Sequence, residues 1–302
     1  MPTSPLSVSF FVADSFTRTR YAGNPAGVLL PDTPLSDAQM RAIAGELHLE
    51  SAFAVPSDMA DADFDVAYYT GAKRIPLCGH DTIALATVLA QQGRLPPSGT
   101  VRLFTDVGVL AVTMDGEGVV TMAQALPRYG QIIPASETAK ALGLPLSEIE
   151  DTTLPVQVVS TGTPFVIVPV MHRAALSALA PNAAMLTAFG DSLTDYADGF
   201  YVWSFETESD DALLHARCFC PAAGLHEDPV TGTASGAVGA YLARQGRLTA
   251  DAEGGVRFRT EQGYVMGRPG NVDVQISRAV GEVTGVAVSG RAVLVGQGTL
   301  WV

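Results

Sequence analysis

The chain has 302 residues, of which 47% are hydrophobic and 16% charged, and its formal net charge is -13 at pH 7. This length suits two domains that each bury a core of their own. An acidic surface repels phosphate backbones, which argues against nucleic-acid binding. Every apolar run is shorter than the ~18 residues that span a bilayer, and the first residues do not resemble a signal peptide. We therefore expect a cytoplasmic protein that is not bound to a membrane.

The first 70 residues predict several strands and one helix. Ser36 is the expected N-cap of this helix, with Gln39 as its capping-box partner. Residues 21–27 contain Gly and an Asn-Pro pair, so we expect a turn or loop there. The predicted strands of this region span residues 8–13, 28–30, 52–55 and 63–69.

An internal repeat is the most informative feature of the sequence. Residues 79–95 (GHDTIALATVLAQQGRL) match residues 232–248 (GTASGAVGAYLARQGRL) at a constant offset of 232 − 79 = 153, with eight identities. The similarity continues from 101–108 to 256–263. Two unrelated Ala-rich helices are the alternative, but an offset of half the chain length together with the second matching block favours a duplicated unit.

Both repeated segments predict helices that are buried on all sides, because their central residues carry no charge. Gly93 and Gly246 are expected to end them in the left-handed conformation. The start of a buried helix presents free N–H groups and a partial positive charge, so it favours an anion. We therefore expect residues 78–80 and 227–233 to face a bound substrate.

Four segments carry a resemblance to a known family. They are residues 14–16 (DSF) with 23–26 (GNPA), 46–53 (ELHLESAF), 78–80 (CGH) and 219–232 (FCPAAGLHEDPVTG). In order and spacing they resemble the phenazine biosynthesis PhzF-like family. The resemblance implies a diaminopimelate-epimerase-like α+β fold: two similar domains, each a curled, mainly antiparallel sheet around a central helix, with the active site in the cleft between them. We expect domains at 1–126 and 127–302, with the final strand crossing back to the first.

The same resemblance implies the site residues. The family's acid/base glutamate falls on Glu50, and Glu46 is the competing choice because the family reads Ser-Glu-Thr where this chain reads Leu-Glu-Ser. His80 and Asp228 match polar active-site residues. The expected substrate-binding residues are the backbone donors Gly79 and Gly232, with Thr233, Asn24 and Cys78.

The three cysteines bear on the type of chemistry. The repeat pairs Cys78 with Thr231, which cannot act as a thiolate base, so a racemase with two opposed thiols is disfavoured. Cys78 is otherwise a small buried residue, and we do not expect it to face His80 as a nucleophile–base pair. Cys218 and Cys220 have only His226 near them in sequence, so packing is expected there and no metal site.

These observations predict an isomerase that needs no cofactor and moves a proton by acid/base catalysis on a small carboxylate-bearing substrate. The resemblance also implies a homodimer. An amino-acid epimerase or racemase on the same fold is the first alternative. A binding protein that has lost catalysis is the second.

Overall fold

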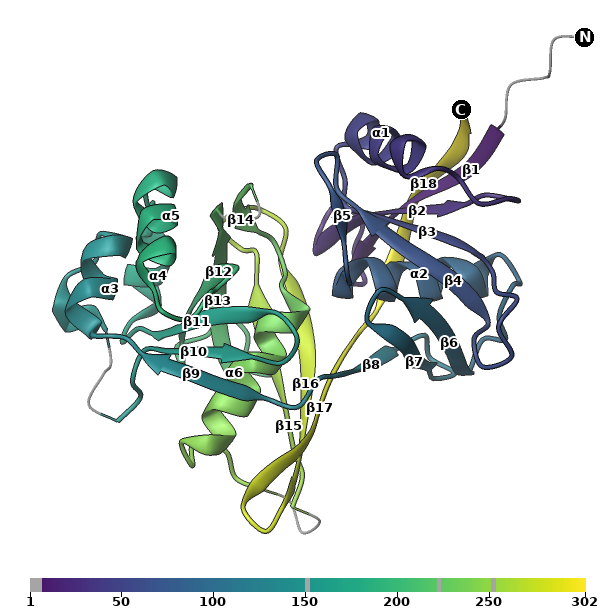
Figure 1. Cartoon of the computed structure of the whole chain (residues 1–302). Helices are drawn as coiled ribbons and strands as arrows, with labels where there is room; N and C mark the ends of the chain where they lie inside the picture. Colours follow the sequence, from purple (N-terminus) through teal and green to yellow (C-terminus); the bar gives the residue numbers. More distant parts are fainter. Residues whose placement is uncertain (1–6, 150–152, 222–223, 251–253) are drawn as a thin grey trace, which may run out of the picture. The chain divides into compact units, whose positions relative to one another are not determined.

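The computed structural model describes residues 7–149, 153–221, 224–250 and 254–302 (Figure 1). It divides into two compact units: Met1–Ala123 with Ser289–Val302, and Gln124–Val288. Two residues of the 219–232 motif, Ala222 and Ala223, lie outside the described residues. Within the described ranges no helix has the length and apolar character to cross a membrane.

The strands of the first unit pair in the order β18, β1, β2, β3, β4, β6, β7 and β8, with β5 beside β4. The β2–β3 and β4–β6 pairs are parallel and the others antiparallel. The elements are β1 (Ser7–Ser15), β2 (Asn24–Leu30), α1 (Asp37–Leu47), β3 (Ser51–Pro56), β4 (Phe64–Tyr69), β5 (Arg74–Ile75), α2 (Gly79–Gln91), β6 (Gly99–Thr105), β7 (Gly108–Met114), β8 (Val120–Gln124) and β18 (Ala292–Trp301).

The second unit pairs its strands in the order β9, β10, β11, β12, β13, β15 and β16, followed by β17, with β14 beside β13. Its elements are β9 (Arg128–Ile132), α3 (Ala135–Leu142), the 3₁₀ turn η1 (Leu146–Glu148), β10 (Gln157–Ser160), β11 (Pro164–Pro169), α4 (Arg173–Ala178), α5 (Ala183–Ser192), β12 (Gly199–Ser204), β13 (Leu214–Cys220), β14 (Leu225–Asp228), α6 (Gly232–Arg244), β15 (Val256–Gln262), β16 (Gly270–Ala279) and β17 (Glu282–Gly290).

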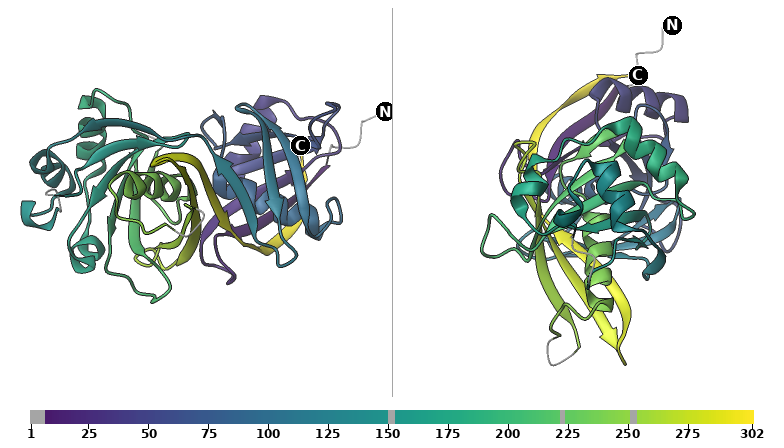
Figure 2. Two further views of the ribbon diagram at one scale, coloured as in Figure 1. Left: turned by 90° about the horizontal axis from the view of Figure 1, so that it is seen from below. Right: turned by 90° about the vertical axis from the view of Figure 1, so that its left-hand side faces the viewer.

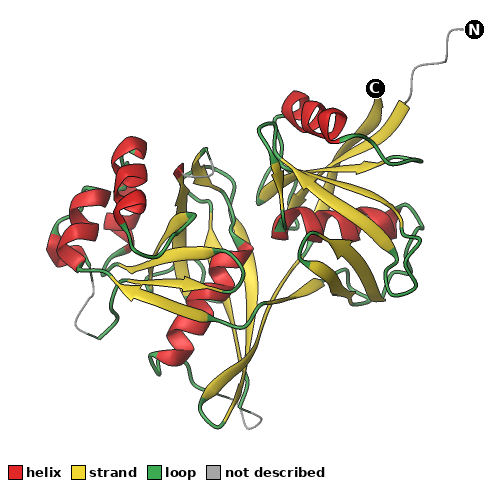
Figure 3. Cartoon of the chain, in the orientation of Figure 1, coloured by secondary structure: helices red, strands yellow, loops and turns green. Residues whose placement is uncertain are grey.

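The same topology occurs in both units. The steps β1, β2, β3, β4, β5, α2, β6 and β7 of the first unit recur as β10, β11, β12, β13, β14, α6, β15 and β16, with parallel pairs at the same two places. The two repeated sequence segments form α2 and α6, which have 13 residues each. Figure 3 shows each of these helices among the strands of its own unit.

The two repeated helices are buried, as their composition predicts. In α2 every residue from His80 to Leu89 is buried, and α2 packs against β1, β2, β3 and β18. Helix α6 packs against β10, β11 and β16, and the left view of Figure 2 shows it with strands of its unit around it. Gly93 and Gly246 follow the helix ends with φ of 67° and 66°, the left-handed conformation expected of them.

The remaining helices cover the outer faces of the sheets. Helix α1 begins with the predicted capping box between Ser36 and Gln39, and its Met40 and Ile43 pack on a cluster that includes Phe53. Helices α3, α4 and α5 cover strands β10 to β13 through a second apolar cluster. The first unit therefore has α1 outside its sheet and α2 inside it, and the second has α6 inside and α3, α4 and α5 outside.

One prediction about the first unit is wrong. Residues 24–27, expected in a turn or loop, form the start of β2, and the turn lies before them, where Gly23 has φ of 64°. The reason is the antiparallel partner: this segment pairs with β1, with Pro25 opposite Asp14. Among the described strands, β3 pairs with β2 only from Gly27 onward. Pro25 therefore lies outside the β2–β3 pairing, where its missing N–H is tolerated.

Candidate functional site

Three of the expected site residues meet at the start of α2. The Cys78 thiol donates to Glu50 Oε2 at 3.2 Å, and Cys78 Sγ lies 3.3 Å from His80 Nδ1. His80 Nε2 lies 3.6 Å from Glu50 Oε2. Cys78 and His80 are buried, whereas the Glu50 side chain is 23% exposed. Glu50 is therefore the member of this group that is most open to an incoming molecule.

Local structure holds this group in place. Glu50 directly precedes β3, and its carbonyl accepts from Gly27 N at 2.9 Å. The helix start is fixed by two hydroxyls, because Ser15 Oγ donates to the His80 carbonyl at 2.6 Å and Thr82 Oγ1 donates to the Cys78 carbonyl at 2.7 Å. These buried bonds tie the first turn of α2 to β1 and to its own second turn.

The expectation that Cys78 and His80 do not face each other is wrong. Cys78 is the N-cap of α2, with extended backbone at φ −130° and ψ 118°, and its side chain makes no capping bond. The extended N-cap and the helical His80 differ in backbone conformation, so the regular helical spacing of side chains does not apply between them. The thiol consequently lies against the imidazole ring.

A fourth group, Asp81, adds negative charge behind the ring. Its side chain is fully buried, and Asp81 Oδ1 lies 3.3 Å from His80 Nε2. Burial raises the pKa of the Cys78 thiol well above its ordinary value, and the negative charges of Asp81 and Glu50 add to the shift. The thiol is therefore protonated at neutral pH and acts as a hydrogen-bond donor rather than as a thiolate.

The two glutamates considered for the acid/base role lie in different surroundings. Glu46 is exposed on α1, whereas Glu50 contacts Cys78 and His80. Asn24, expected to bind substrate, is buried at the first position of β2, opposite Ser15 of β1. Gly79 is the first residue of α2 and is half-buried.

The start of α6, in the second unit, carries the remaining expected residues. Thr231 is its N-cap, and its hydroxyl donates to Asp228 Oδ2 at 2.5 Å. Gln262 joins both residues: its Nε2 donates to the Asp228 carbonyl at 2.7 Å, and its Oε1 accepts from Thr231 N at 3.1 Å. The buried Asp228 thus accepts from Thr231 through its carboxyl and from Gln262 through its backbone carbonyl.

Gly232 and Thr233 form the first turn of α6. Gln124 Nε2 donates to the Gly232 carbonyl at 3.2 Å, and Thr161 Oγ1 donates to the Thr233 carbonyl at 3.3 Å. Thr161 also donates to Gln124 Oε1 at 2.6 Å. This network binds the carbonyls of the first turn of α6 and so fixes the orientation of the helix start.

Glu227 departs from the expectation that residues 227–233 face a substrate. Its carboxylate accepts two hydrogen bonds from Arg217, of 2.8 and 2.7 Å. The Arg217 side chain is 5% exposed and the Glu227 side chain 9%. Arg217 Nη1 also donates to the carbonyls of Leu176 and Leu179 at the end of α4. Glu227 therefore anchors β14 and is not available to a ligand.

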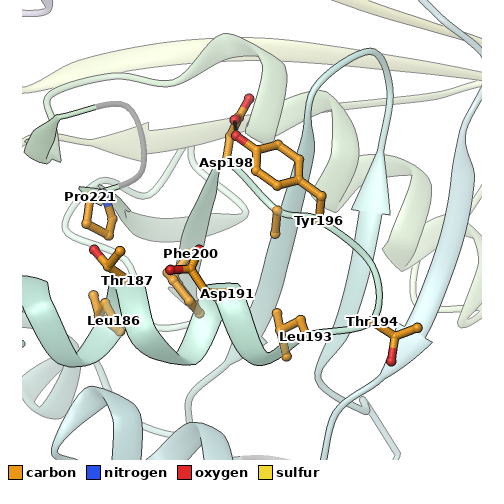
Figure 4. Close-up of a pocket in the computed structure, with 11 residues that line it drawn as sticks. Leu186, Thr187, Asp191, Leu193, Thr194, Tyr196, Asp198, Phe200 and Pro221 are labelled. Atoms are coloured by element: carbon orange, nitrogen blue, oxygen red, sulfur yellow. Dashed lines mark hydrogen bonds between the residues drawn. The ribbon is translucent and has the colours of Figure 1, made fainter.

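The second unit also contains an open pocket that the sequence did not predict (Figure 4). It has a volume of about 220 Å³ and is lined by residues that include Thr187, Asp191, Tyr196, Asp198 and Phe200. The Tyr196 hydroxyl donates to Asp198 Oδ1. This pocket includes none of the expected site residues. Cys218 and Cys220 are buried with their sulfurs 3.6 Å apart, in keeping with the packing role expected of them.

The comparisons with known proteins decide the family. The family model of the phenazine biosynthesis-like proteins (PhzC-PhzF) matches residues 13–298. The chain belongs to this family. It is 33% identical to an uncharacterized isomerase from Clostridium acetobutylicum, over 95% of this chain and 96% of that protein. It is 29% identical to the trans-2,3-dihydro-3-hydroxyanthranilate isomerase of Pseudomonas chlororaphis, over 96% and 98% of the two chains.

A solved structure supports the same assignment. The crystal structure of the PhzF-family phenazine biosynthesis protein of Bacillus anthracis has a TM-score of 0.88 to this chain at 28% identity, covering 98% of this chain and 99% of that one. The mixed α+β fold is therefore that of the PhzF family. The protein is a PhzF-family isomerase.

Sequence reasoning missed the hydroxyls that support the site. Ser15 and Thr82 hold the first turn of α2, and Tyr68 contacts Thr82 at 2.7 Å. One signal was available: the repeat aligns Thr82 with Ser235, since 82 + 153 = 235, and Ser235 Oγ donates to the Thr231 carbonyl in the same way. A hydroxyl kept at both places indicates a shared structural role.

Proposed function

We propose that this protein catalyses a cofactor-independent proton shift on a small carboxylate-bearing substrate, with Glu50 as the acid/base group. The observation that carries the proposal is the position of Glu50, whose carboxylate accepts from the Cys78 thiol and lies beside the His80 ring while its side chain stays 23% exposed. A base that abstracts a proton must reach the substrate. Glu50 satisfies this requirement, and the buried groups around it do not.

The proposed reaction needs one acid/base group and one group of hydrogen-bond donors that stabilises negative charge. The Glu50 carboxylate takes a proton from one carbon of the substrate, the electron pair moves along the adjacent double bond, and the protonated Glu50 returns the proton to another carbon. Negative charge develops on the substrate during this step. The N–H groups at the start of α2 and the positive end of its dipole would stabilise that charge, since Gly79 opens the helix without a side chain.

The neighbours of Glu50 then have positioning roles. His80 lies between Glu50 and Asp81, so its ring fixes the direction of the Glu50 carboxylate. Cys78 donates a hydrogen bond to the same carboxylate and remains a thiol. We include Asp228, Gly232, Thr233 and Asn24 in the proposal as residues that hold the substrate. We also expect a homodimer, which light scattering after size exclusion measures directly.

The alternatives are less well supported by these residues. A racemase with two opposed thiolates needs a second cysteine, and Thr231 stands at the N-cap of α6 where Cys78 stands in α2. The raised pKa of the Cys78 thiol also opposes a thiolate base. An epimerase would exchange the α-proton of an amino acid with solvent. A binding protein would exchange no carbon-bound proton at all.

The test uses trans-2,3-dihydro-3-hydroxyanthranilate, the substrate in the name of the Pseudomonas chlororaphis relative, followed by other small cyclic or unsaturated acids. We expect conversion to an isomer, with solvent deuterium appearing at one carbon. Glu50→Gln should abolish conversion and leave folding and ligand binding intact. Glu46→Gln is the matched control, because Glu46 is exposed on α1. Undiminished turnover by Glu50→Gln would falsify the assignment of the base, and exchange at an amino-acid α-carbon would favour the epimerase.

A further inference from the structure

The start of α2 holds a donor set that the proton shift alone does not require. Glu50, Cys78, His80 and Asp81 place a carboxylate oxygen, a sulfur, an imidazole nitrogen and a second carboxylate oxygen within 4.8 Å of one another. This combination of thiol, imidazole and carboxylate is the one that Zn²⁺ and similar cations prefer. Among the residues that the structure describes, it is the one group of this kind.

We propose that this group is a binding site for a thiophilic divalent cation, of which Zn²⁺ is the type, and that the bound cation inhibits the isomerase. The ligands are Glu50 Oε2, Cys78 Sγ, His80 Nε2 and Asp81 Oδ1. The binding part of the proposal stands by itself. The inhibitory part rests on the proposed role of Glu50.

The separations between these atoms fit a tetrahedral ion. With bonds of about 2.3 Å to sulfur and about 2.0–2.2 Å to nitrogen and oxygen, ligand atoms around tetrahedral zinc lie about 3.4–3.6 Å apart. The observed separations are 3.2 Å from Sγ to Oε2, 3.8 Å from Sγ to Nε2, 3.6 Å from Nε2 to Oε2 and 3.3 Å from Nε2 to Oδ1. The two nitrogen–oxygen separations, 3.6 and 3.3 Å, exceed the usual length of a hydrogen bond. These four separations therefore need to shift by only a few tenths of an ångström, and the other two pairs of ligand atoms lie within 4.8 Å of each other.

Charge and access also favour a cation. Two carboxylates and a thiol surround one imidazole, and Asp81 is fully buried. A dication in their midst would offset this negative charge, and on coordination the thiol would release its proton to solvent. Glu50, with 23% of its side chain exposed, is the point of entry. Once its carboxylate is a ligand, it cannot take a proton from the substrate, so turnover stops.

The fixed backbone around the site would make it selective among divalent cations. Ser15 and Thr82 hold the backbone at His80 and Cys78, so three of the four ligands come from one fixed helix start. Mg²⁺ and Ca²⁺ prefer oxygen ligands in larger number. We therefore expect Zn²⁺ and Co²⁺ to bind and Mg²⁺ to leave the enzyme active.

The binding test uses the full chain, freed of metal by a chelator, and titrates it with ZnCl₂ by calorimetry without substrate. We expect one equivalent to bind. Cys78→Ser and Glu50→Gln should each weaken binding by roughly tenfold or more, since even groups outside the ligand shell typically change metal affinity about 10- to 100-fold. Co²⁺ should give a thiolate charge-transfer absorption that Cys78→Ser lacks.

The double variant Cys218→Ser/Cys220→Ser is the matched control, because these two sulfurs lie 3.6 Å apart in the other unit. It should bind Zn²⁺ like the wild type. Unchanged affinity in Cys78→Ser, or loss of binding in the double variant alone, overturns the proposal. Circular dichroism melts show which variants fold, and if Cys78→Ser does not, Glu50→Gln and the cobalt spectrum decide. If zinc binds through Cys78 but does not slow turnover, only the inhibitory part is refuted. If the metal-free protein shows no turnover, the proposed function is refuted and the binding result still stands.

Discussion

The first turns of α2 and α6 share a scaffold and differ in chemistry. In each, a hydroxyl one turn into the helix donates to the carbonyl of the N-cap residue: Thr82 to Cys78 at 2.7 Å and Ser235 to Thr231 at 2.9 Å. The N-cap residues themselves differ. Cys78 contacts Glu50 and His80, whereas Thr231 is engaged with Asp228 and Gln262. Duplication thus preserved the support of the helix start and left its side chains free to diverge.

The acidic residue that precedes the second strand of the parallel pair, β2–β3 in one unit and β11–β12 in the other, has also diverged between the units. Glu50 precedes β3, where Ser51 pairs with Gly27, and Asp198 precedes β12, where Gly199 pairs with Phe165. Asp198 accepts from the Tyr196 hydroxyl, and this bond raises the pKa of Tyr196 to about 12. The two carboxylates thus hold matching places in the two units. Glu50 lies beside a thiol and an imidazole ring, whereas Asp198 accepts a hydrogen bond from a phenol.

The largest expected effect separates these two acids. Glu50→Gln should abolish turnover, with a loss in kcat of at least the ~10²- to 10⁴-fold that general acid–base groups supply, whereas Asp198→Asn should leave kcat nearly unchanged. Steady-state kinetics with whichever test acid the wild type converts measures both. Comparable losses in the two variants would show that the duplicated acids share the work, and the one-sided mechanism would be wrong.

The sequence predicted most of the repeated framework and only part of the site. The helices of the repeat, their Gly93 and Gly246 ends and the Ser36 capping box follow from local patterns, and all are present. The start of β2 was missed because pairing with β1 outweighs the local turn signal of Gly, Asn and Pro. Local rules fail where a distant strand decides the conformation.

The site shows the same division. Glu50 and His80 were identified by resemblance, but their contact depends on a strand start and a helix start that lie 30 residues apart in sequence, since 80 − 50 = 30. The contact of Cys78 with His80 depends on the extended backbone of an N-cap, which helical periodicity does not describe. Nothing in the sequence indicates that Arg217 forms an ion pair with Glu227.

The next largest effect concerns the strand that leads into α6. Arg217→Met should lower the free energy of unfolding by about 3–5 kcal/mol, because it leaves the buried Glu227 carboxylate without its charge partner. The carbonyls of Leu176 and Leu179 lose their donor as well. Chemical denaturation measures the change. The double variant Arg217→Met/Glu227→Gln should recover part of the loss, and if it recovers none, the buried charge is not the cause.

A smaller effect is expected inside the helices. A Cβ at Gly239 of α6 would lie 2.8 Å from Val274 Cγ1 and 3.1 Å from Ile276 Cδ1. Such overpacking costs about 1–3 kcal/mol, and the better helix propensity of Ala returns only ~1 kcal/mol. Gly239→Ala should therefore destabilise the protein by about 1 kcal/mol in denaturation experiments. The repeat places Ala86 at the matching position of α2, since 239 − 153 = 86, and a Gly239→Ala variant that gained stability would mean that α6 has room for the side chain that α2 carries.

The smallest effect is expected at β5, which leads into α2 as β14 leads into α6. Here too an arginine binds a carboxylate through two bonds, Arg74 to Asp106 at 2.8 and 2.6 Å, but the two side chains are 41% and 39% exposed. Water already solvates both charges, so removing one leaves no buried ion behind. Arg74→Met should consequently change the free energy of unfolding by about 1 kcal/mol or less, and its effect should diminish further in high salt. A loss as large as that of Arg217→Met would mean that burial does not distinguish the two anchors, and that the strands before both helices depend on their ion pairs equally.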